Sequence, residues 1–219
     1  MITVFKGSGG FVRSFTLIAL LVGIGAFPAF ADIVNNGGFE AQDISHTNYY
    51  VTVSAASAPE CGVAHNPTLP SLTGWTVTGC SVDIVNGPSW AHTGSQAIDL
   101  VGSPGPGGIE QSISTTPGAY YNFSFWASSN GGAITNGLDV GWNGVNIAIV
   151  STPAQGQWTP FSYRVQATGS STVISLSSPL GGDAGPLVDD VSVPEPSSLF
   201  GLGAGLALSL GLALRLRSV

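Results

Sequence analysis

The chain has 219 residues, of which only 8% are charged, and its formal net charge is −7. Lys6, Arg13, Arg215 and Arg217 lie near the two ends, so residues 32–193 contain a single cation, Arg164. A segment with eleven acids and one cation is excluded from binding nucleic acid or anionic lipid through phosphate contacts. Its neutral polar side chains suit uncharged ligands such as sugars, although they are also ordinary in secreted all-β proteins.

The first 31 residues predict a secretory signal peptide. Lys6 and Arg13 give a positive start, residues 15–27 are apolar, and a small-x-small pattern ends at Ala31. We place the cleavage between Ala31 and Asp32. The domain that follows, residues 32–193, is long enough for one sizeable core.

This domain shows no helical period, and its pattern predicts strands. Short alternating runs are separated by Gly, Pro, Asn and Ser, which is typical of an all-β fold. Alternation within residues 187–193 places Asp189 on the same face as Leu187, Val191 and Val193. The number of runs favours a jelly-roll β-sandwich of two antiparallel sheets. The predicted strands are 49–54, 75–78, 81–85, 97–100, 108–114, 121–125, 145–149, 161–165, 171–177 and 187–193.

Two cysteines, Cys61 and Cys80, both lie in the exported part of the chain. An oxidising compartment favours a disulfide between them, worth about 3 kcal/mol in the chain-entropy model. Two free thiols are the alternative.

A series of short motifs carries a resemblance that covers residues 33–193. In this order they resemble the galactose-binding-like jelly rolls of bacterial carbohydrate-binding modules, and they are similar to a cell-wall-associated plant family built from two such domains. The resemblance implies the fold more specifically than it implies sugar binding, because a fold does not fix a function. The motifs are VNNGGFE (34–40), GWTV (74–77), VDIV (82–85), HTGSQAIDL (92–100), IEQSI (109–113), PGAYYNFSF (117–125) and GPLVDDVSV (185–193).

The same resemblance implies a structural calcium where the first and last strands meet. The ligands carried over are Glu40 and Asp189 or Asp190, with backbone carbonyls of residues 92–94 completing the shell. Calcium takes six to eight oxygens, and a shell of this kind would tie the chain ends together. The alternative is that these acids are solvated or hydrogen-bonded at the sheet edge.

Exposed aromatic rings are the predicted ligand contacts, because sugar rings stack on them. Trp90 and Trp142 stand beside glycines or prolines in turn-like segments, and Tyr49 is a further candidate. Tyr50 and Trp126 could also be exposed, whereas Trp75 and Trp158 are expected in the core.

Motifs for catalysis are missing from the sequence. There is no Gly-x-Ser-x-Gly elbow and no His-Glu-x-x-His. We therefore expect a protein that is not an enzyme. A glycoside hydrolase is the alternative, with Asp99, Glu110 and Asp139 as candidates by residue type alone.

The C-terminal residues 194–219 combine three signals. Pro194-Glu195-Pro196 precedes the uncharged stretch 199–214, which as a helix would span roughly 24 Å, and a basic end with Arg215 and Arg217 follows. The positive-inside rule keeps these arginines in the cytoplasm and the domain outside. The segment closely resembles the sorting signal of bacterial PEP-CTERM proteins, which implies recognition by a membrane-embedded exosortase. A plain membrane anchor is the alternative.

Together these features predict an exosortase substrate at the cell surface or in the extracellular matrix of a Gram-negative bacterium. We expect it to be held in the inner membrane until its tail is processed, and to bind or organise exopolysaccharide. A structural matrix protein without a specific ligand is the alternative.

Overall fold

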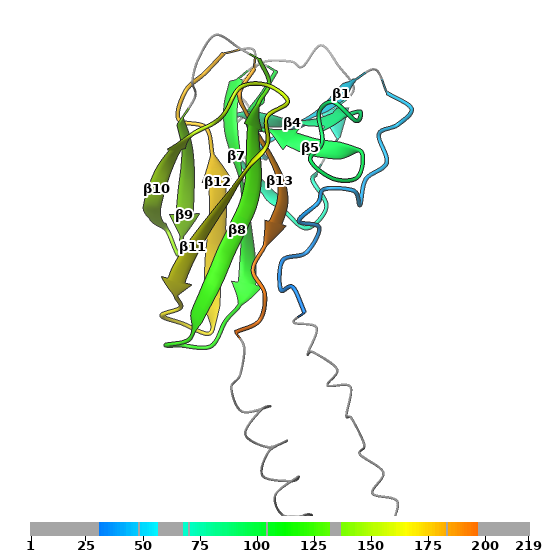
Figure 1. Ribbon diagram of the computed structural model, residues 1–219. Coiled ribbons are helices and arrows are strands. Elements are labelled where there is room, and N and C mark those ends of the chain that lie inside the picture. Colours follow the sequence, from blue (N-terminus) through cyan, green and yellow to red (C-terminus); the bar gives the residue numbers. More distant parts are fainter. Residues whose placement is uncertain are drawn as a thin grey trace, which may run out of the picture.

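The computed structural model describes residues 31–47, 49–56, 68–69, 71–103, 105–131, 137–182 and 184–196. These residues form two stacked β-sheets (Figure 1). One sheet has the order β11-β8-β13-β5-β4-β1-β2, and the other has the order β10-β9-β12-β7-β3 with β6 paired to β7. The strands are β1 (Tyr50–Ser54), β2 (Thr68–Leu69), β3 (Thr76–Gly79), β4 (Ser81–Asn86), β5 (Gln96–Asp99), β6 (Val101–Gly102), β7 (Gly105–Ser114), β8 (Tyr120–Ser129), β9 (Gly137–Trp142), β10 (Val145–Ser151), β11 (Thr159–Gln166), β12 (Ser171–Ser177) and β13 (Pro186–Ser192).

The predicted all-β sandwich is confirmed. All strand pairs in the described part of the chain are antiparallel except β1 with β2, which is parallel. The last strand, β13, lies inside its sheet and bonds to β8 on one side and to β5 on the other. The predicted terminal segments, residues 1–30 and 197–219, lie outside the described residues.

The core lies between the two sheets. Strand β8 contributes Tyr121, Phe123 and Phe125, which are at most 3% exposed, as their alternation predicted. Across the core, β12 contributes Ile174 and Leu176, both fully buried. The aromatic face of one sheet therefore packs against aliphatic side chains of the other.

Strand β10 corrects one prediction. The alternation of Val145, Ile147 and Ile149 predicts one inner face for all three. Ile147 packs on the core as expected, but Val145 and Ile149 are 63% and 70% exposed. The register against β9 shifts between Asn146 and Ala148. An inserted residue of this kind moves the side chains after it to the opposite face, so Ala148 packs on the core beside Ile147 and Ile149 faces outward.

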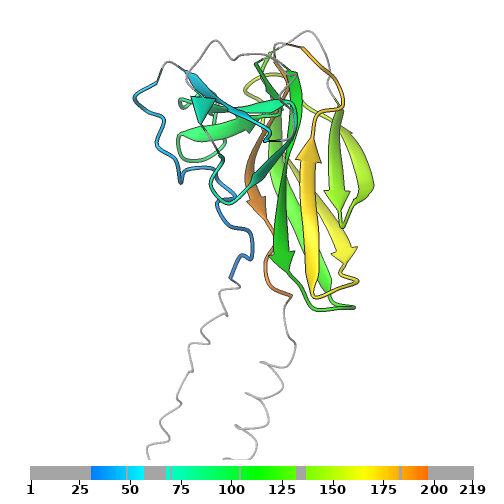
Figure 2. The same ribbon diagram turned by 180° about the vertical axis from the view of Figure 1, so that it is seen from behind.

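The two ends of the domain lie side by side at one pole of the sandwich (Figure 2). Ile33 N donates to Val193 O at 3.1 Å, and Glu195 N donates to Ala31 O at 3.0 Å. The carboxylate of Asp32 accepts from Val193 N at 2.9 Å. Within the residues described, no helix is long and apolar enough to cross a membrane.

Candidate functional site: an aromatic patch held by three carboxylates

A second apolar cluster lies on the face of the seven-stranded sheet that points away from the core. Its buried members are Val85 of β4, Ala97 of β5 and Leu187 of β13, and Val85 is paired directly with Ala97. Their neighbours along each strand belong to the main core, so these three side chains project outward. Tyr50, Trp90 and Trp158 pack against the cluster and are partly buried.

The connection between β4 and β5 folds back over this outer face. Gly87 N donates to Ser95 O at 2.8 Å, which closes the loop at its base. Ala91 N and Trp90 N both donate to Gly87 O, forming a tight turn. Residues 87–95, which we call the covering loop, therefore lie against the sheet with Trp90 and His92 at its centre.

His92 connects the covering loop to Trp126 of β8 and to Trp158, which directly precedes β11. Its ring stacks on Trp126 with the ring centroids 3.8 Å apart and the planes at 15°. Trp158 approaches from a centroid distance of 5.8 Å at a tilt. We call Tyr50, Trp90, His92, Trp126 and Trp158 the aromatic patch. All five are half-buried, so each presents part of its surface to solvent.

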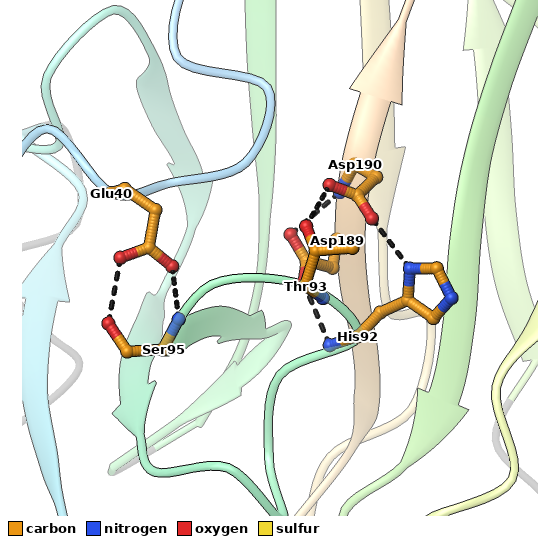
Figure 3. Close-up of polar contacts among 6 residues, drawn as sticks. All are labelled: Glu40, His92, Thr93, Ser95, Asp189 and Asp190. Carbon is orange, nitrogen blue, oxygen red and sulfur yellow. Dashed lines mark hydrogen bonds and ion pairs between the residues drawn. The ribbon is translucent and has the colours of Figure 1, made fainter.

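Asp189 anchors the middle of the covering loop (Figure 3). Its side chain is fully buried, and its Oδ2 accepts the backbone N–H groups of His92 at 2.9 Å and Thr93 at 3.1 Å. Burial raises the pKa of this carboxyl to about 7, although the N–H donors act in the opposite direction.

Asp190 fixes the His92 ring. The Nδ1 of His92 lies 2.6 Å from Asp190 Oδ2, and because an ionised carboxylate only accepts, Nδ1 is the donor. The other carboxylate oxygen accepts from Thr93 Oγ1 at 2.6 Å. The imidazole is thus held at the orientation in which it stacks on Trp126.

Glu40 holds the end of the covering loop. Its Oε1 accepts the N–H groups of Ser95 and Gln96 at 2.7 Å each, and its Oε2 accepts from Ser95 Oγ at 2.8 Å (Figure 3). Gly94 has φ +63°, and a Cβ there would lie 2.4 Å from Glu40 Oε1. Only glycine meets both conditions without strain.

A bulge at Asp190 explains how two consecutive aspartates reach the same loop. Asp190 has φ +48°, and the register of β13 against β8 shifts between Asp189 and Ser192. Asp189 shares the outer face with Leu187 as predicted. The expectation that Val191 and Val193 lie on that face is wrong, because the inserted residue turns both into the core.

The three predicted calcium ligands are all tied to the covering loop, but their oxygens already have donors. Each of the six carboxylate oxygens of Glu40, Asp189 and Asp190 accepts an N–H or O–H. In the described ranges, no three His, Cys, Asp or Glu residues are grouped so that they could hold a metal ion. A carboxylate oxygen that binds an ion can also accept a hydrogen bond, so the misfit lies in the grouping, since the three carboxylates do not converge on one point. Calcium stays a prediction, one that requires these carboxylates to come together.

Trp142 corrects a predicted ligand contact. It is 6% exposed, packs against Tyr121 and Phe123, and donates from Nε1 to Gln166 O at 3.0 Å. Its flanking glycines suggested a turn, but residues 137–142 form β9 and place Trp142 on the inner face. The alternation of Leu138, Val140 and Trp142 was the signal for this strand.

The remaining predicted aromatics are distributed differently. Trp90 lies in the aromatic patch. Tyr49, which precedes Tyr50 of the patch in the sequence, is 75% exposed. Trp75 is in the core as expected, whereas Trp158 is only half-buried and belongs to the patch. The contact of His92 with Trp126 was missed, since the two residues are joined only by the sheet order.

Cys80 is disulfide-bonded, and Cys61, its predicted partner, lies outside the described residues. The pairing of these two cysteines therefore stays a prediction.

The acids named for a hydrolase lie on different sheets. Asp99 is on β5, whereas Glu110 and Asp139 are on β7 and β9. Asp99 is 1% exposed and is paired across strands with the buried Asp83. Burial raises the pKa of Asp99 to about 7.

Comparisons with known proteins match this chain to one family and find several proteins that are distantly similar to it. A family model described as "Protein of unknown function (DUF642)" matches residues 32–194. Halomucin of Haloquadratum walsbyi is 30% identical over 174 residues, which are 76% of this chain and 2% of Halomucin, so the chain spans a very small part of that relative.

Two solved structures are similar to this chain at low sequence identity. A cyclase from Fischerella sp. TAU is 15% identical, with a TM-score of 0.51 over 77% of this chain and 98% of the cyclase. TmCBM61, solved in complex with β-1,4-galactotriose, is 20% identical, with a TM-score of 0.48 over 74% of this chain and 97% of that one. The family match covers most of the sequence and all of the residues that build the aromatic patch. The chain therefore belongs to the DUF642 family, whose function is unknown.

Proposed function

We propose that this protein is an exported, non-enzymatic carbohydrate-binding protein that holds neutral polysaccharide on its aromatic patch. The observation that carries the proposal is the gathering of Trp90, Trp126 and Trp158 around His92 on one outer face, each half-buried. Flat apolar rings that keep part of their surface in solvent suit the C–H faces of sugar rings.

Polar groups beside the patch complement the hydroxyls of a sugar. The side chains of His92 and Asp190 are 23% and 28% exposed, and Thr93 is exposed next to them. Carboxylate and imidazole groups accept or donate hydrogen bonds to hydroxyls without requiring a charged ligand. Arg164, the one cation of residues 32–193, is engaged with Tyr120 at 3.9 Å from the ring centroid. The patch therefore favours a neutral ligand over an anionic one.

Export and surface sorting belong to the same proposal. The signal peptide (1–31) and the tail (194–219) with its resemblance to PEP-CTERM proteins support a route across the inner membrane. Exosortase is the proposed partner at that membrane, and the cell surface or extracellular matrix is the proposed destination.

Affinity electrophoresis in gels containing the producing organism's exopolysaccharide tests the binding. Trp158→Ala should weaken the apparent affinity measured from the retardation roughly fivefold, because the lost ring contact is worth about 1 kcal/mol. Tyr120→Ala removes a ring that is 48% exposed outside the patch and serves as the matched control. Equal retardation of both variants would contradict the patch as the binding site.

Two other outcomes of the same experiment favour the alternatives. An unretarded wild-type domain would favour a structural matrix protein without a specific ligand. Release of reducing ends during incubation with the polysaccharide would favour a hydrolase, and we expect no release.

A further inference from the structure

A polar hollow lies on the opposite side of the sandwich. It has a volume of about 220 Å³ and is formed by β9, β10 and β12 of the six-stranded sheet. Pockets for drug-sized ligands measure about 300–1,000 Å³, so this one matches a smaller molecule, such as a single sugar unit. Its lining includes Asp139, Gly141, Val145, Asn146, Ser175 and Ser177.

The strand register explains why the hollow is polar. Ser175 is paired with Gly141, and Ser177 with Asp139. The residues that alternate with them are fully buried in the core, so these four positions face outward. Gly141 provides the depth, since a Cβ there would lie 2.1 Å from Ser175 Oγ.

Asp139, which lines the hollow, has a side-chain oxygen whose hydrogen-bonding capacity is unused. Its Oδ1 is buried and has no hydrogen-bond partner in the part of the chain that the structure describes. A buried oxygen left in this state costs free energy, and a carboxylate oxygen costs more than a neutral one. A small rotation of the side chain toward the hollow would offer this oxygen to a ligand O–H group.

Apolar side chains beside the hollow suit the rest of a sugar ring. Val145 lines it, and Ile149, which is paired with Asp139, is 70% exposed. Both are aliphatic groups without an evident structural role, and they can contact C–H groups. The hollow thus combines hydroxyl-binding groups with an apolar rim.

We propose that this hollow is a second site for a neutral sugar unit, which makes the domain bivalent. This inference rests on the proposed function, since it assigns the first site to the aromatic patch. The two sites lie on the outer faces of two sheets packed about 10 Å apart and point in opposite directions. One domain can therefore join two polysaccharide strands, and cross-linking follows from a single folded unit without oligomerisation.

Site-resolved heteronuclear NMR with galactose, glucose and mannose tests the second site. Gly141 and Gly144 both line the hollow, so their backbone amides report on it. The indole N–H groups of Trp126 and Trp158 report on the patch. In the wild type, at least one of the three sugars is expected to shift both sets of signals. Asp139→Asn should abolish the shifts at the hollow and leave those at the patch.

Glu110→Gln is the matched control, because Glu110 is a half-buried carboxylate on the same face of the same sheet and does not line the hollow. It should leave both sets of shifts unchanged. Shifts at the patch alone would overturn the second site and leave the proposed function standing. Shifts at the hollow alone, or at neither place, would overturn bivalency and also count against the patch. If calcium chloride shifted the Gly141 signal and none of the sugars did, the hollow would be a cation site and the proposal would be overturned.

Stability separates a binding role of Asp139 from a structural one. Removing an unsatisfied buried carboxylate should leave the melting temperature of Asp139→Asn equal to or above that of the wild type. The wild type is expected to raise the light scattering of exopolysaccharide by cross-linking it, whereas the same variant should still bind the polysaccharide without raising its scattering. A clearly lowered melting temperature, or unchanged scattering, would contradict the proposal.

Discussion

Carboxylates on the two outer faces of the sandwich differ in how their oxygens are hydrogen-bonded. On the seven-stranded sheet, Asp189 is fully buried and its oxygens accept three backbone N–H groups. On the six-stranded sheet, Asp139 has a buried oxygen with no partner among the residues described. The covering loop makes the difference, since it brings N–H donors to one face and leaves the other open. The same residue type is structural on the first face and available to a ligand on the second.

The largest expected effect is the loss of the Asp189 anchor. Asp189→Ala leaves the N–H groups of His92 and Thr93 without their acceptor and should lower the free energy of unfolding by about 3 kcal/mol. Urea denaturation measures the change. Asp139→Ala is the comparison and should change stability by less than about 1 kcal/mol. Similar losses for both variants would remove the distinction between the faces.

The dependence of stability on pH should also be set by the seven-stranded sheet. Burial raises the pKa values of Asp99 and Asp189 to about 7, from the ordinary value of 3.8 for an aspartate. Between these pH values the folded state binds more protons than the unfolded state, so stability falls as the pH rises. We expect a melting temperature several degrees higher near pH 5 than near pH 8.

A variant of Asp99 tests whether protonation of the buried aspartates makes the domain more stable at low pH. The variant Asp99→Asn does not titrate, so its melting temperature should depend less steeply on pH. A wild-type domain that becomes steadily more stable from pH 5 to pH 8 would show that the N–H donors outweigh burial at both aspartates.

A smaller effect isolates the contact between Glu40 and the covering loop. Gly94→Ala places a methyl group against Glu40 Oε1 and adds the strain of φ +63°, which together should lower the free energy of unfolding by about 2 kcal/mol. Gly144→Ala has φ +78° in open space and should lose only about 1 kcal/mol. Chemical denaturation of both variants measures the difference between their free energies of unfolding. Equal losses would mean that the Glu40 side chain moves aside without cost.

The smallest expected effect is that of a chelator. Because the three carboxylates at the covering loop do not converge on one point, EDTA should leave the melting temperature unchanged. A drop of several degrees, reversed by calcium, would show that Glu40, Asp189 and Asp190 come together around an ion.

Alternation predicted most of the strands, and its failures have a local cause. The inner face of β8 followed directly from Tyr121, Phe123 and Phe125, since nothing interrupts that strand. In β10 and β13 an inserted residue shifts the register, which no apolar pattern reveals in advance. The prediction therefore failed for the faces of Ile149 and Val191.

The aromatic patch was less accessible to prediction than the strands. Trp90 could be chosen from its turn-like surroundings, but His92 meets Trp126 only because β13 lies between β5 and β8. That order depends on the whole topology. The hollow at Asp139 had no sequence signal beyond an acid alternating with apolar residues in β9.

The pairing of the domain ends has a mechanical consequence. Tension applied through the C-terminal segment enters at Val193 and passes into β13, which is held by hydrogen bonds on both edges. These bonds run across the strand, so a pull along its axis loads many of them at once instead of opening them one after another. A domain tethered by that end would resist detachment by shear, whereas tension on its N-terminal end is met first by the few hydrogen bonds of Ala31, Asp32 and Ile33.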